Sequence, residues 1–216
     1  MRSKKQLLKN WKLYVILDAG LFSDRRLLRN KFYELAESPI DALQIRCKAE
    51  IDFSLFLMIK KMASFLKKKK IFFIINDKPE LVSCFGADGV HLGKGDIPVR
   101  LARKIAGKDA VIGSTIRNAC DIREVQKQGA DYAAIGPVFS TPLKPELKQV
   151  TPKILKETIR AANLPLVAIG GINTSNVREI SRFGVKTVAF ARYAVTEKNT
   201  EYRIKLIKQI LDTEIK

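Results

Sequence analysis

The sequence is poor in the residues that build disulfide frameworks and zinc sites. Its 216 residues include three cysteines and one histidine. Cys47, Cys84 and Cys120 lie far apart and form no C-x-x-C pair, so neither a disulfide framework nor a zinc-ligand cluster is expected. An odd number of scattered cysteines is typical of a reducing compartment, and we expect a cytoplasmic protein.

Long apolar stretches are absent as well. No run approaches the roughly 18 apolar residues that a membrane helix requires. The first apolar run, Leu13–Leu17, is too short for a signal peptide and ends at Asp18. Because no segment is low in complexity or has the composition of a linker, we predict a single domain over residues 1–216, with a basic N-terminal extension at about 1–11.

Acidic residues are few relative to basic ones. The chain has 40 Lys and Arg residues against 22 Asp and Glu, for a formal net charge of +18. Basic surface alone can bind nucleic-acid phosphates, but no aromatic-interleaved basic patch or RNP-like string accompanies it. Solvated lysines on helix faces, or a field that attracts anionic substrates, explain the same charge. Nucleic-acid binding therefore stays an alternative only.

What the sequence does contain is a repeated alternation of short apolar runs and amphipathic segments. The runs predict buried parallel strands at Leu13–Leu17, Ala42–Ile45, Ile71–Ile75, Gly89–Leu92, Ala110–Ile112, Tyr132–Ile135, Leu166–Ile169 and Thr187–Phe190. Helices are predicted at Arg25–Ala36, Ile51–Leu66, Pro98–Ile105, Ala119–Gln128, Thr151–Ala162, Ser175–Phe183 and Tyr202–Leu211. This α/β alternation predicts a single (β/α)8 TIM barrel. An open doubly wound sheet is the alternative, although no G-x-G-x-x-G motif follows the first strand.

Two neighbouring predicted strands are followed by carboxylates. Asn76 and Asp77 follow one strand, and Asp96 lies in the loop after the next. Because parallel strands end on the same face, Asp77 and Asp96 should lie close together. Paired carboxylates among lysines and arginines predict a Mg²⁺ site for a phosphorylated ligand.

The end of the second predicted strand carries three polar side chains in alternation. Gln44, Arg46 and Lys48 should all point to the same side of that strand. In a barrel, this side faces the mouth, where the loops after the strands gather. An amide, a guanidinium and an ammonium group are therefore expected to converge there.

Two later strands are followed by residues suited to phosphate. After the sixth strand, Thr141 supplies a hydroxyl and Lys144 a cation. After the seventh, Gly170 and Gly171 let the backbone approach a ligand closely, and N–H groups there can cradle a phosphate.

Five motifs occur in the order and spacing of a known family. QIRCK, FIINDKPELV, GADGVHLGKGDIP, GADYAAIGPVFST–K and LPLVAIGGIN resemble the thiamine-phosphate synthase family and its TenI relatives, from about Tyr14 to Ala194. The resemblance implies a transferase that joins hydroxymethylpyrimidine diphosphate to a thiazole phosphate and releases pyrophosphate, with Mg²⁺ as cofactor. The implied partners are these two small-molecule substrates, with no nucleic acid and no membrane; a homo-oligomer is left open.

The resemblance also implies roles on the donor side of the site. Gln44 would meet the pyrimidine, and Thr115, which stands where the family usually has a serine, would lie beside it and the diphosphate. Asp77 and Asp96 would carry Mg²⁺. The diphosphate would be held by Arg46, Lys48, Asn76 and Lys144, of which Arg46, Lys48 and Lys144 would be catalytic because they stabilise the leaving pyrophosphate.

On the acceptor side, the resemblance is weaker. Thr141, Gly171 and the turn at Ala191-Arg192 would receive the thiazole phosphate. Leu143 replaces a threonine of the family, and Ala191-Arg192 stands where many members have an Ile-Ser pair.

A TenI-like thiazole tautomerase or a diverged family member therefore stays the alternative. Arg117 counts against the tautomerase, because it stands in place of the histidine that TenI proteins use for proton transfer. The single histidine, His91, is interpreted as a packed or hydrogen-bonded residue, and Tyr14 as a core residue. No catalytic role is assigned to Asp18.

Overall fold

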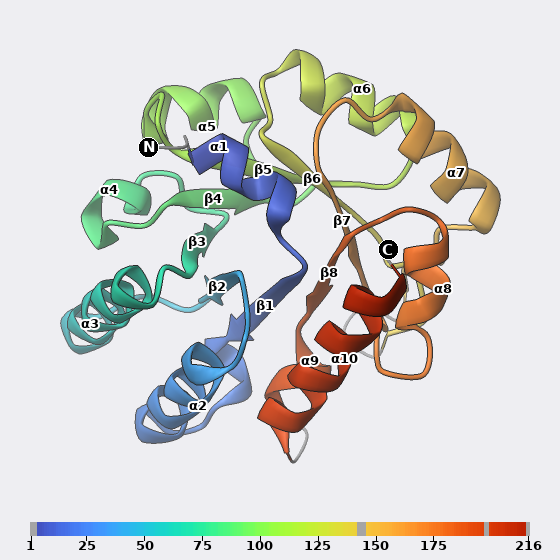
Figure 1. Cartoon of the computed structure of the whole chain (residues 1–216). Coiled ribbons are helices and arrows are strands. Elements are labelled where there is room, and N and C mark those ends of the chain that lie inside the picture. Colours follow the sequence, from blue (N-terminus) through green and yellow to red (C-terminus); the bar gives the residue numbers. More distant parts are fainter. Residues whose placement is uncertain (1–3, 142–145, 197–198, 215–216) are drawn as a thin grey trace.

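Eight parallel strands close into a barrel in the computed structural model, which describes residues 4–141, 146–196 and 199–214. The strands follow one another in chain order from β1 to β8, and β8 pairs back with β1. The helices surround this barrel (Figure 1). The predicted (β/α)8 TIM barrel is thus confirmed, and the open doubly wound sheet is excluded.

The strands lie close to the predicted apolar runs, with one exception. Their bounds are β1 Leu13–Asp18, β2 Ala42–Arg46, β3 Phe72–Asn76, β4 Gly89–Leu92, β5 Val111–Ile116, β6 Tyr132–Ile135, β7 Leu166–Ile169 and β8 Thr187–Phe190. The prediction ended the fifth strand at Ile112, which is wrong. β5 continues because Gly113, Ser114 and Thr115 pair with residues of β4 or β6. The apolar content of the segment does not reveal this pairing.

Helices connect the strands and cover the outside of the barrel. They are α1 Lys4–Leu7, α2 Arg25–Glu37, α3 Phe53–Lys69, α4 Leu81–Phe85, α5 Val99–Ala106, α6 Ala119–Lys127, α7 Pro152–Ala161, α8 Val177–Arg182, α9 Arg192–Val195 and α10 Thr200–Glu214, with 3₁₀ turns η1 Leu8–Asn10 and η2 Ala19–Leu21. The short helices α1, α4 and α9 were not predicted, because four or five residues do not show an amphipathic period. α3 begins two residues later than predicted, because the Asp52 carboxylate accepts the Leu55 N–H at 3.0 Å and caps the helix.

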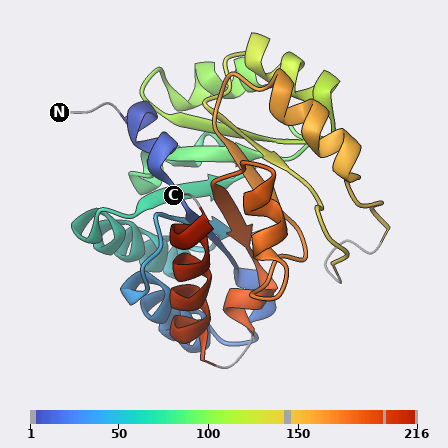
Figure 2. The same cartoon turned by 45° about the vertical axis from the view of Figure 1, so that its right-hand side comes forward.

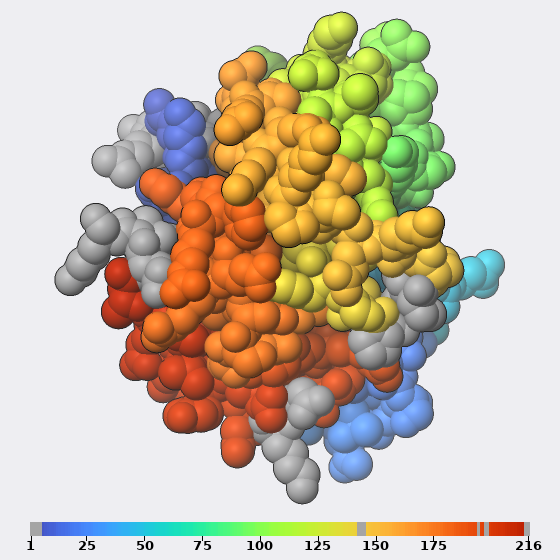
Figure 3. All heavy atoms as spheres, turned by 90° about the vertical axis from the view of Figure 1, so that its right-hand side faces the viewer, coloured from blue at the N-terminus to red at the C-terminus, as the bar shows by residue number. Residues whose placement is uncertain are grey.

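The last helix closes the ring of helices. α10 packs against α2 and α8, as Figure 2 shows. On the adjacent face, side chains of α7 and α8 hide the strands behind them (Figure 3). None of the described helices has the length and apolarity needed to cross a membrane.

The amino end of the barrel is filled by aromatic side chains. Trp11 packs edge-on against Phe72 at 4.9 Å between ring centroids and lies 5.6 Å from the Tyr132 ring. Leu8 and Trp11, which belong to the predicted N-terminal extension, are 2% and 3% exposed. Figure 1 shows α1 in front of this end of the barrel. Ligand access is therefore left to the carboxyl ends of the strands.

Candidate active site

A cavity of about 1140 Å³ lies at the carboxyl ends of the strands. Small-molecule sites usually measure roughly 300–1000 Å³, so this one has room for a large ligand or two small ones. It brings together every predicted site residue that the structure describes: Gln44, Arg46, Lys48, Asn76, Asp77, Asp96, Thr115, Thr141, Gly171, Ala191 and Arg192. Lys144 and Leu143 lie outside the described residues.

Arg46 forms an ion pair that was not predicted from the sequence. Its guanidinium donates to the carboxylate of Asp18, and the two side chains are 27% and 15% exposed. The pair arises because Asp18 and Arg46 are register partners at the ends of β1 and β2. Lys48, two residues further on, is exposed at the cavity edge. The one signal for Asp18 was its position directly after an apolar run.

Asp77 and Asp96 interact as their positions predicted. Partial burial and the neighbouring Asp96 raise the pKa of Asp77 to about 6, although the positive charge of Arg46 opposes this. The Asp96 carboxylate accepts the Gly93 N–H at 2.6 Å, which holds the loop after β4 against it. The Asp96 carboxylate thus makes the negative charge of Asp77 less favourable.

This pair fits a hard divalent cation. A cation between the two groups would relieve their repulsion, and carboxylate oxygens are suitable ligands for Mg²⁺. Within the described part of the chain, no three His, Cys, Asp or Glu side chains gather as a metal-binding group. The remaining coordination positions would therefore be left to water and ligand oxygens, as is common for Mg²⁺ at phosphate sites.

The loop after β7 is shaped by Gly171. Its φ is +64°, and a Cβ at this position would lie 2.3 Å from the Ser140 carbonyl oxygen, so a side chain is excluded. The Gly171 N–H donates to no other described residue, whereas its carbonyl accepts the Asn176 side-chain amide at 2.9 Å. The loop therefore has a backbone donor available to an anionic ligand.

Arg117 joins two loops on the same side of the cavity. Its guanidinium donates to the Gly136 carbonyl at 3.0 Å and to the Lys148 carbonyl. The segment that follows β6 is thereby tied to the end of β5. From the sequence, Arg117 stands out only by its difference from a histidine of the family, because two carbonyl acceptors carry no sequence signal.

The floor of the cavity is polar and buried. His91 is 8% exposed and hydrogen-bonds with both nitrogens, to Tyr132 and to Thr115. The interpretation of His91 as a hydrogen-bonded residue is confirmed, and so is that of Tyr14 as a core residue, since it is 1% exposed.

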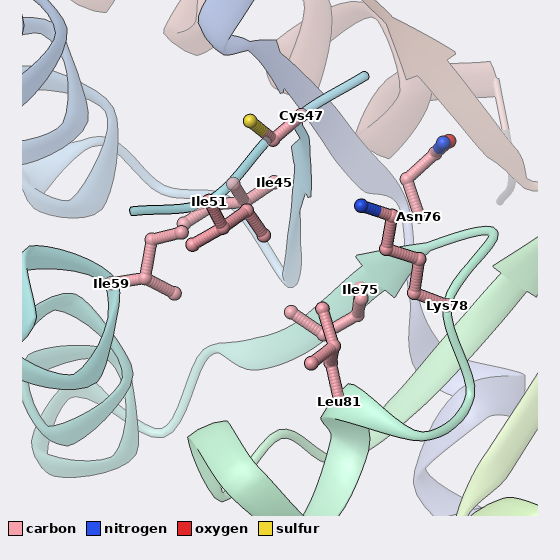
Figure 4. A pocket seen from close by; sticks show the side chains of 8 residues that line it. All are labelled: Ile45, Cys47, Ile51, Ile59, Ile75, Asn76, Lys78 and Leu81. Carbon is pink, nitrogen blue, oxygen red and sulfur yellow. The ribbon is translucent and has the colours of Figure 1, made fainter. Parts of the chain in front are cut away.

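A second, smaller void lies between β2, β3 and α3. Figure 4 shows its apolar wall, formed by Ile45, Ile51, Ile59, Ile75 and Leu81, with Lys78 extending over it toward Cys47. Its volume of about 10 Å³ is at the limit for one water molecule.

Cys47 lines this void and is not activated as a nucleophile. Burial raises the pKa of its thiol, and the thiolate is the reactive form of cysteine. The thiol donates weakly to the Ala49 carbonyl at 3.6 Å. These observations support a packing role.

The fold and the cavity together define a class of protein. Barrel enzymes place their chemistry on the loops after the strands, and this cavity combines basic side chains, adjacent carboxylates and a glycine-lined turn. Such a combination is typical of enzymes that act on phosphorylated small molecules.

The family follows from comparison with known proteins. The profile of the family described as "Thiamine monophosphate synthase" matches residues 13–194, and the chain belongs to this family. Thiamine-phosphate synthase of Coprothermobacter proteolyticus is 33% identical over 214 residues, which cover 98% of this chain and 100% of that protein. Thiamine-phosphate synthase of Methanosarcina mazei is 34% identical over 217 residues, covering 97% and 88%.

Other matches are partial or structural. Thiamine-phosphate synthase of Prochlorococcus marinus MIT 9313 is 37% identical over 150 residues, but these cover 69% of this chain and only 42% of that longer protein. The solved thiamine phosphate pyrophosphorylase of Pyrococcus furiosus has a TM-score of 0.85 and 27% identity, covering 97% of this chain and 100% of the other. A 3-hexulose-6-phosphate synthase structure, at 13% identity and a TM-score of 0.67, shares the fold alone.

Proposed function

We propose that the protein is a thiamine-phosphate synthase, which joins hydroxymethylpyrimidine diphosphate to a thiazole phosphate and releases pyrophosphate. One observation carries the proposal: the described residues expected to bind either substrate all line the same cavity. Two relatives that are named thiamine-phosphate synthase and match nearly the whole chain support it.

The residues suit the bond changes of this reaction. The bond between the pyrimidine methylene carbon and the diphosphate oxygen breaks, and the leaving pyrophosphate keeps the electron pair. The thiazole nitrogen then donates its lone pair to the methylene carbon. Arg46 and Lys48 would stabilise the charge that develops on the leaving oxygen. Since the aminopyrimidine ring can delocalise positive charge on the methylene, no protein nucleophile is required.

The same residues would orient the substrates. Gln44 and Thr115 would meet the pyrimidine and the Gly171 backbone would meet the thiazole phosphate, and all three line the cavity. Orientation in a shared cavity can account for a large part of the rate. Mg²⁺ held by Asp77 and Asp96 would supply further neutralisation of the leaving pyrophosphate.

The test is to incubate the protein with both substrates and Mg²⁺ and to follow both products. Thiamine phosphate and pyrophosphate formed together, and lost with EDTA, would support the synthase and its metal. Hydroxymethylpyrimidine diphosphate that binds without any product would overturn the proposal. Conversion of a thiazole phosphate without the pyrimidine substrate would instead establish a tautomerase.

The raised pKa of Asp77 predicts how Mg²⁺ binding depends on pH. Above pH 6, Asp77 is ionised and can bind a cation, whereas below pH 6 a proton must first be released. We expect the apparent Mg²⁺ affinity to fall by about tenfold per pH unit below pH 6. Titration of Mg²⁺ at pH 5 and pH 8 checks this, and equal affinities would contradict it.

The free energy of unfolding should also depend on the ionisation of Asp77, but it should fall as pH rises, whereas the Mg²⁺ affinity rises. A carboxyl group whose pKa is raised from 3.8 to about 6 binds more protons in the folded state. The metal-free protein therefore loses stability as pH rises from about 4 to 6, and Mg²⁺ should raise Tm more at pH 8 than at pH 5. Asp77→Asn is the control, because asparagine tolerates the left-handed φ of +62° at this position and should remove the pH dependence.

The location and the oligomeric state of the protein are proposed as well. A cytoplasmic location is supported by the free thiols of Cys47, Cys84 and Cys120. Association into a homo-oligomer stays a prediction, to be measured by light scattering.

A further inference from the structure

A chain of hydrogen bonds connects two residues of the cavity floor through the interior of the barrel. The Gln44 side-chain Nε2 donates to Tyr14 Oη at 2.6 Å, and Tyr14 Oη lies 3.1 Å from Tyr132 Oη. Tyr132 Oη lies 3.0 Å from His91 Nδ1, and His91 Nε2 lies 3.0 Å from Thr115 Oγ1. Gln44 and Thr115 line the cavity, so both ends of the chain can meet a ligand.

The members between the two ends are shielded from water. Tyr14 is 1% exposed and Tyr132 is 0% exposed. Burial raises the pKa of both phenols, so each hydroxyl keeps its proton. A buried hydroxyl without an acceptor is costly, and the protons of the chain must therefore be ordered.

The hydrogen bond that Gln44 donates to Tyr14 determines which group is the donor in each of the following hydrogen bonds. Tyr14 Oη accepts the amide, and its own proton is directed to Tyr132 Oη. Tyr132 then donates to His91 Nδ1, which must be the unprotonated nitrogen. His91 consequently carries its proton on Nε2 and donates to Thr115 Oγ1, so the Thr115 proton is free to point into the cavity.

A glycine makes the central contact sterically feasible. Gly113 of β5 pairs with His91 on one side and with Tyr132 on the other. A Cβ on Gly113 would lie 2.0 Å from Tyr132 Cζ. The Tyr132 ring thus crosses the space that a side chain would fill, and it stacks on the His91 ring with 5.5 Å between centroids.

We propose that Tyr132 is a positioning residue that acts through His91: it fixes the Nε2–H tautomer and thereby makes Thr115 a hydrogen-bond donor to the ligand. The matching ligand atom is an acceptor, such as a ring nitrogen of a heteroaromatic substrate. That this ligand is the pyrimidine rests on the proposed function, whereas the order of the protons does not.

The tautomer can be measured without any substitution. Because His91 is the only histidine, ¹⁵N-histidine labelling reports this residue alone. At pH 8, we expect a protonated Nε2 and an unprotonated Nδ1. An Nδ1–H tautomer would mean that the chain runs in the other direction and would overturn the proposal, even if the protein is an active synthase.

Tyr132→Phe tests the role of the hydroxyl and keeps the ring. His91 should then populate both tautomers, and kcat/KM for hydroxymethylpyrimidine diphosphate should fall by about 10–100-fold, by analogy with the loss of an outer hydrogen-bond partner of a metal-bound histidine. KM for the thiazole phosphate should not change. Tyr202→Phe, at a 66% exposed position of α10, is the matched control. Unchanged tautomer and kinetics in Tyr132→Phe, or equal losses for both substrates, would refute a positioning role.

Substitutions at Thr115 test the cavity end of the chain and leave both tyrosines in place. Thr115→Val removes the donor and should reproduce the loss for the pyrimidine substrate, whereas Thr115→Ser should retain most of the activity. If His91 has the expected tautomer but the protein forms no thiamine phosphate, the order of the protons is supported and only the proposed function is rejected.

Discussion

Asp96→Asn is expected to impair Mg²⁺-dependent formation of thiamine phosphate severely while the barrel stays folded. Asparagine keeps an oxygen that can accept the Gly93 N–H, which Asp96 accepts at 2.6 Å. What it removes is one of the two negative charges that would hold the cation. We expect kcat/KM to fall by on the order of 10²–10³-fold, the typical cost of removing one electrostatic contact to a transition state.

The stability of this variant should change in the opposite direction from its activity. Asp96 raises the pKa of Asp77, so removal of its charge relieves repulsion in the metal-free protein. Tm without Mg²⁺ should be equal to or higher than that of the parent, and the increase in Tm on adding Mg²⁺ should disappear. Asp109→Asn, in the exposed turn before β5 at the opposite end of the barrel, is the control. Parental activity in Asp96→Asn would reject the metal site.

Arg46→Ala is expected to have a comparable effect for a different reason. The substitution removes the guanidinium proposed to hold the diphosphate, and it also leaves the Asp18 carboxylate without its ion-pair partner. Because Arg46 lowers the pKa of Asp77, that pKa should rise further in the variant. We expect a loss of on the order of 10²–10³-fold in kcat/KM, accompanied by the higher pKa of Asp77 in the metal-free protein.

Two other variants separate these contributions. Arg46→Lys keeps the positive charge but not the planar fork of donors, so it should restore the pKa of Asp77 more completely than turnover. Arg160→Ala, in the exposed last turn of α7, should behave like the parent. If Arg46→Ala retains normal turnover, the assignment of the diphosphate side is wrong.

Most of the strands could be predicted because each is a short apolar run that stays buried on both faces. The helix α3 was equally clear, since its apolar residues repeat along one face. The fifth strand was underestimated, because Gly113, Ser114 and Thr115 are held in the sheet by their neighbours rather than by their own hydrophobicity. Short helices such as α4 also gave no signal, since five residues are too few for a period.

The candidate site could likewise be predicted only in part. Arg46, Asp77 and Asp96 could be placed together from sequence, because all parallel strands of a barrel present their carboxyl ends on one face. The pairing of Arg46 with Asp18 could not, since it depends on the register between β1 and β2. The joining of two loops by Arg117 is a further case, because its acceptors are backbone carbonyls.

The sequence by itself therefore determined the barrel, the face on which the cavity lies and the candidate site residues that line it. Only the tertiary structure decided which of these side chains contact one another. Tyr14 and Tyr132 show why. They lie 118 positions apart in the sequence, and each has the pattern of an ordinary core residue. Their hydroxyl groups meet because closure of the barrel directs both side chains into the same interior. The chain of hydrogen bonds inside the barrel forms only when the barrel closes, and no local pattern of residues predicts it.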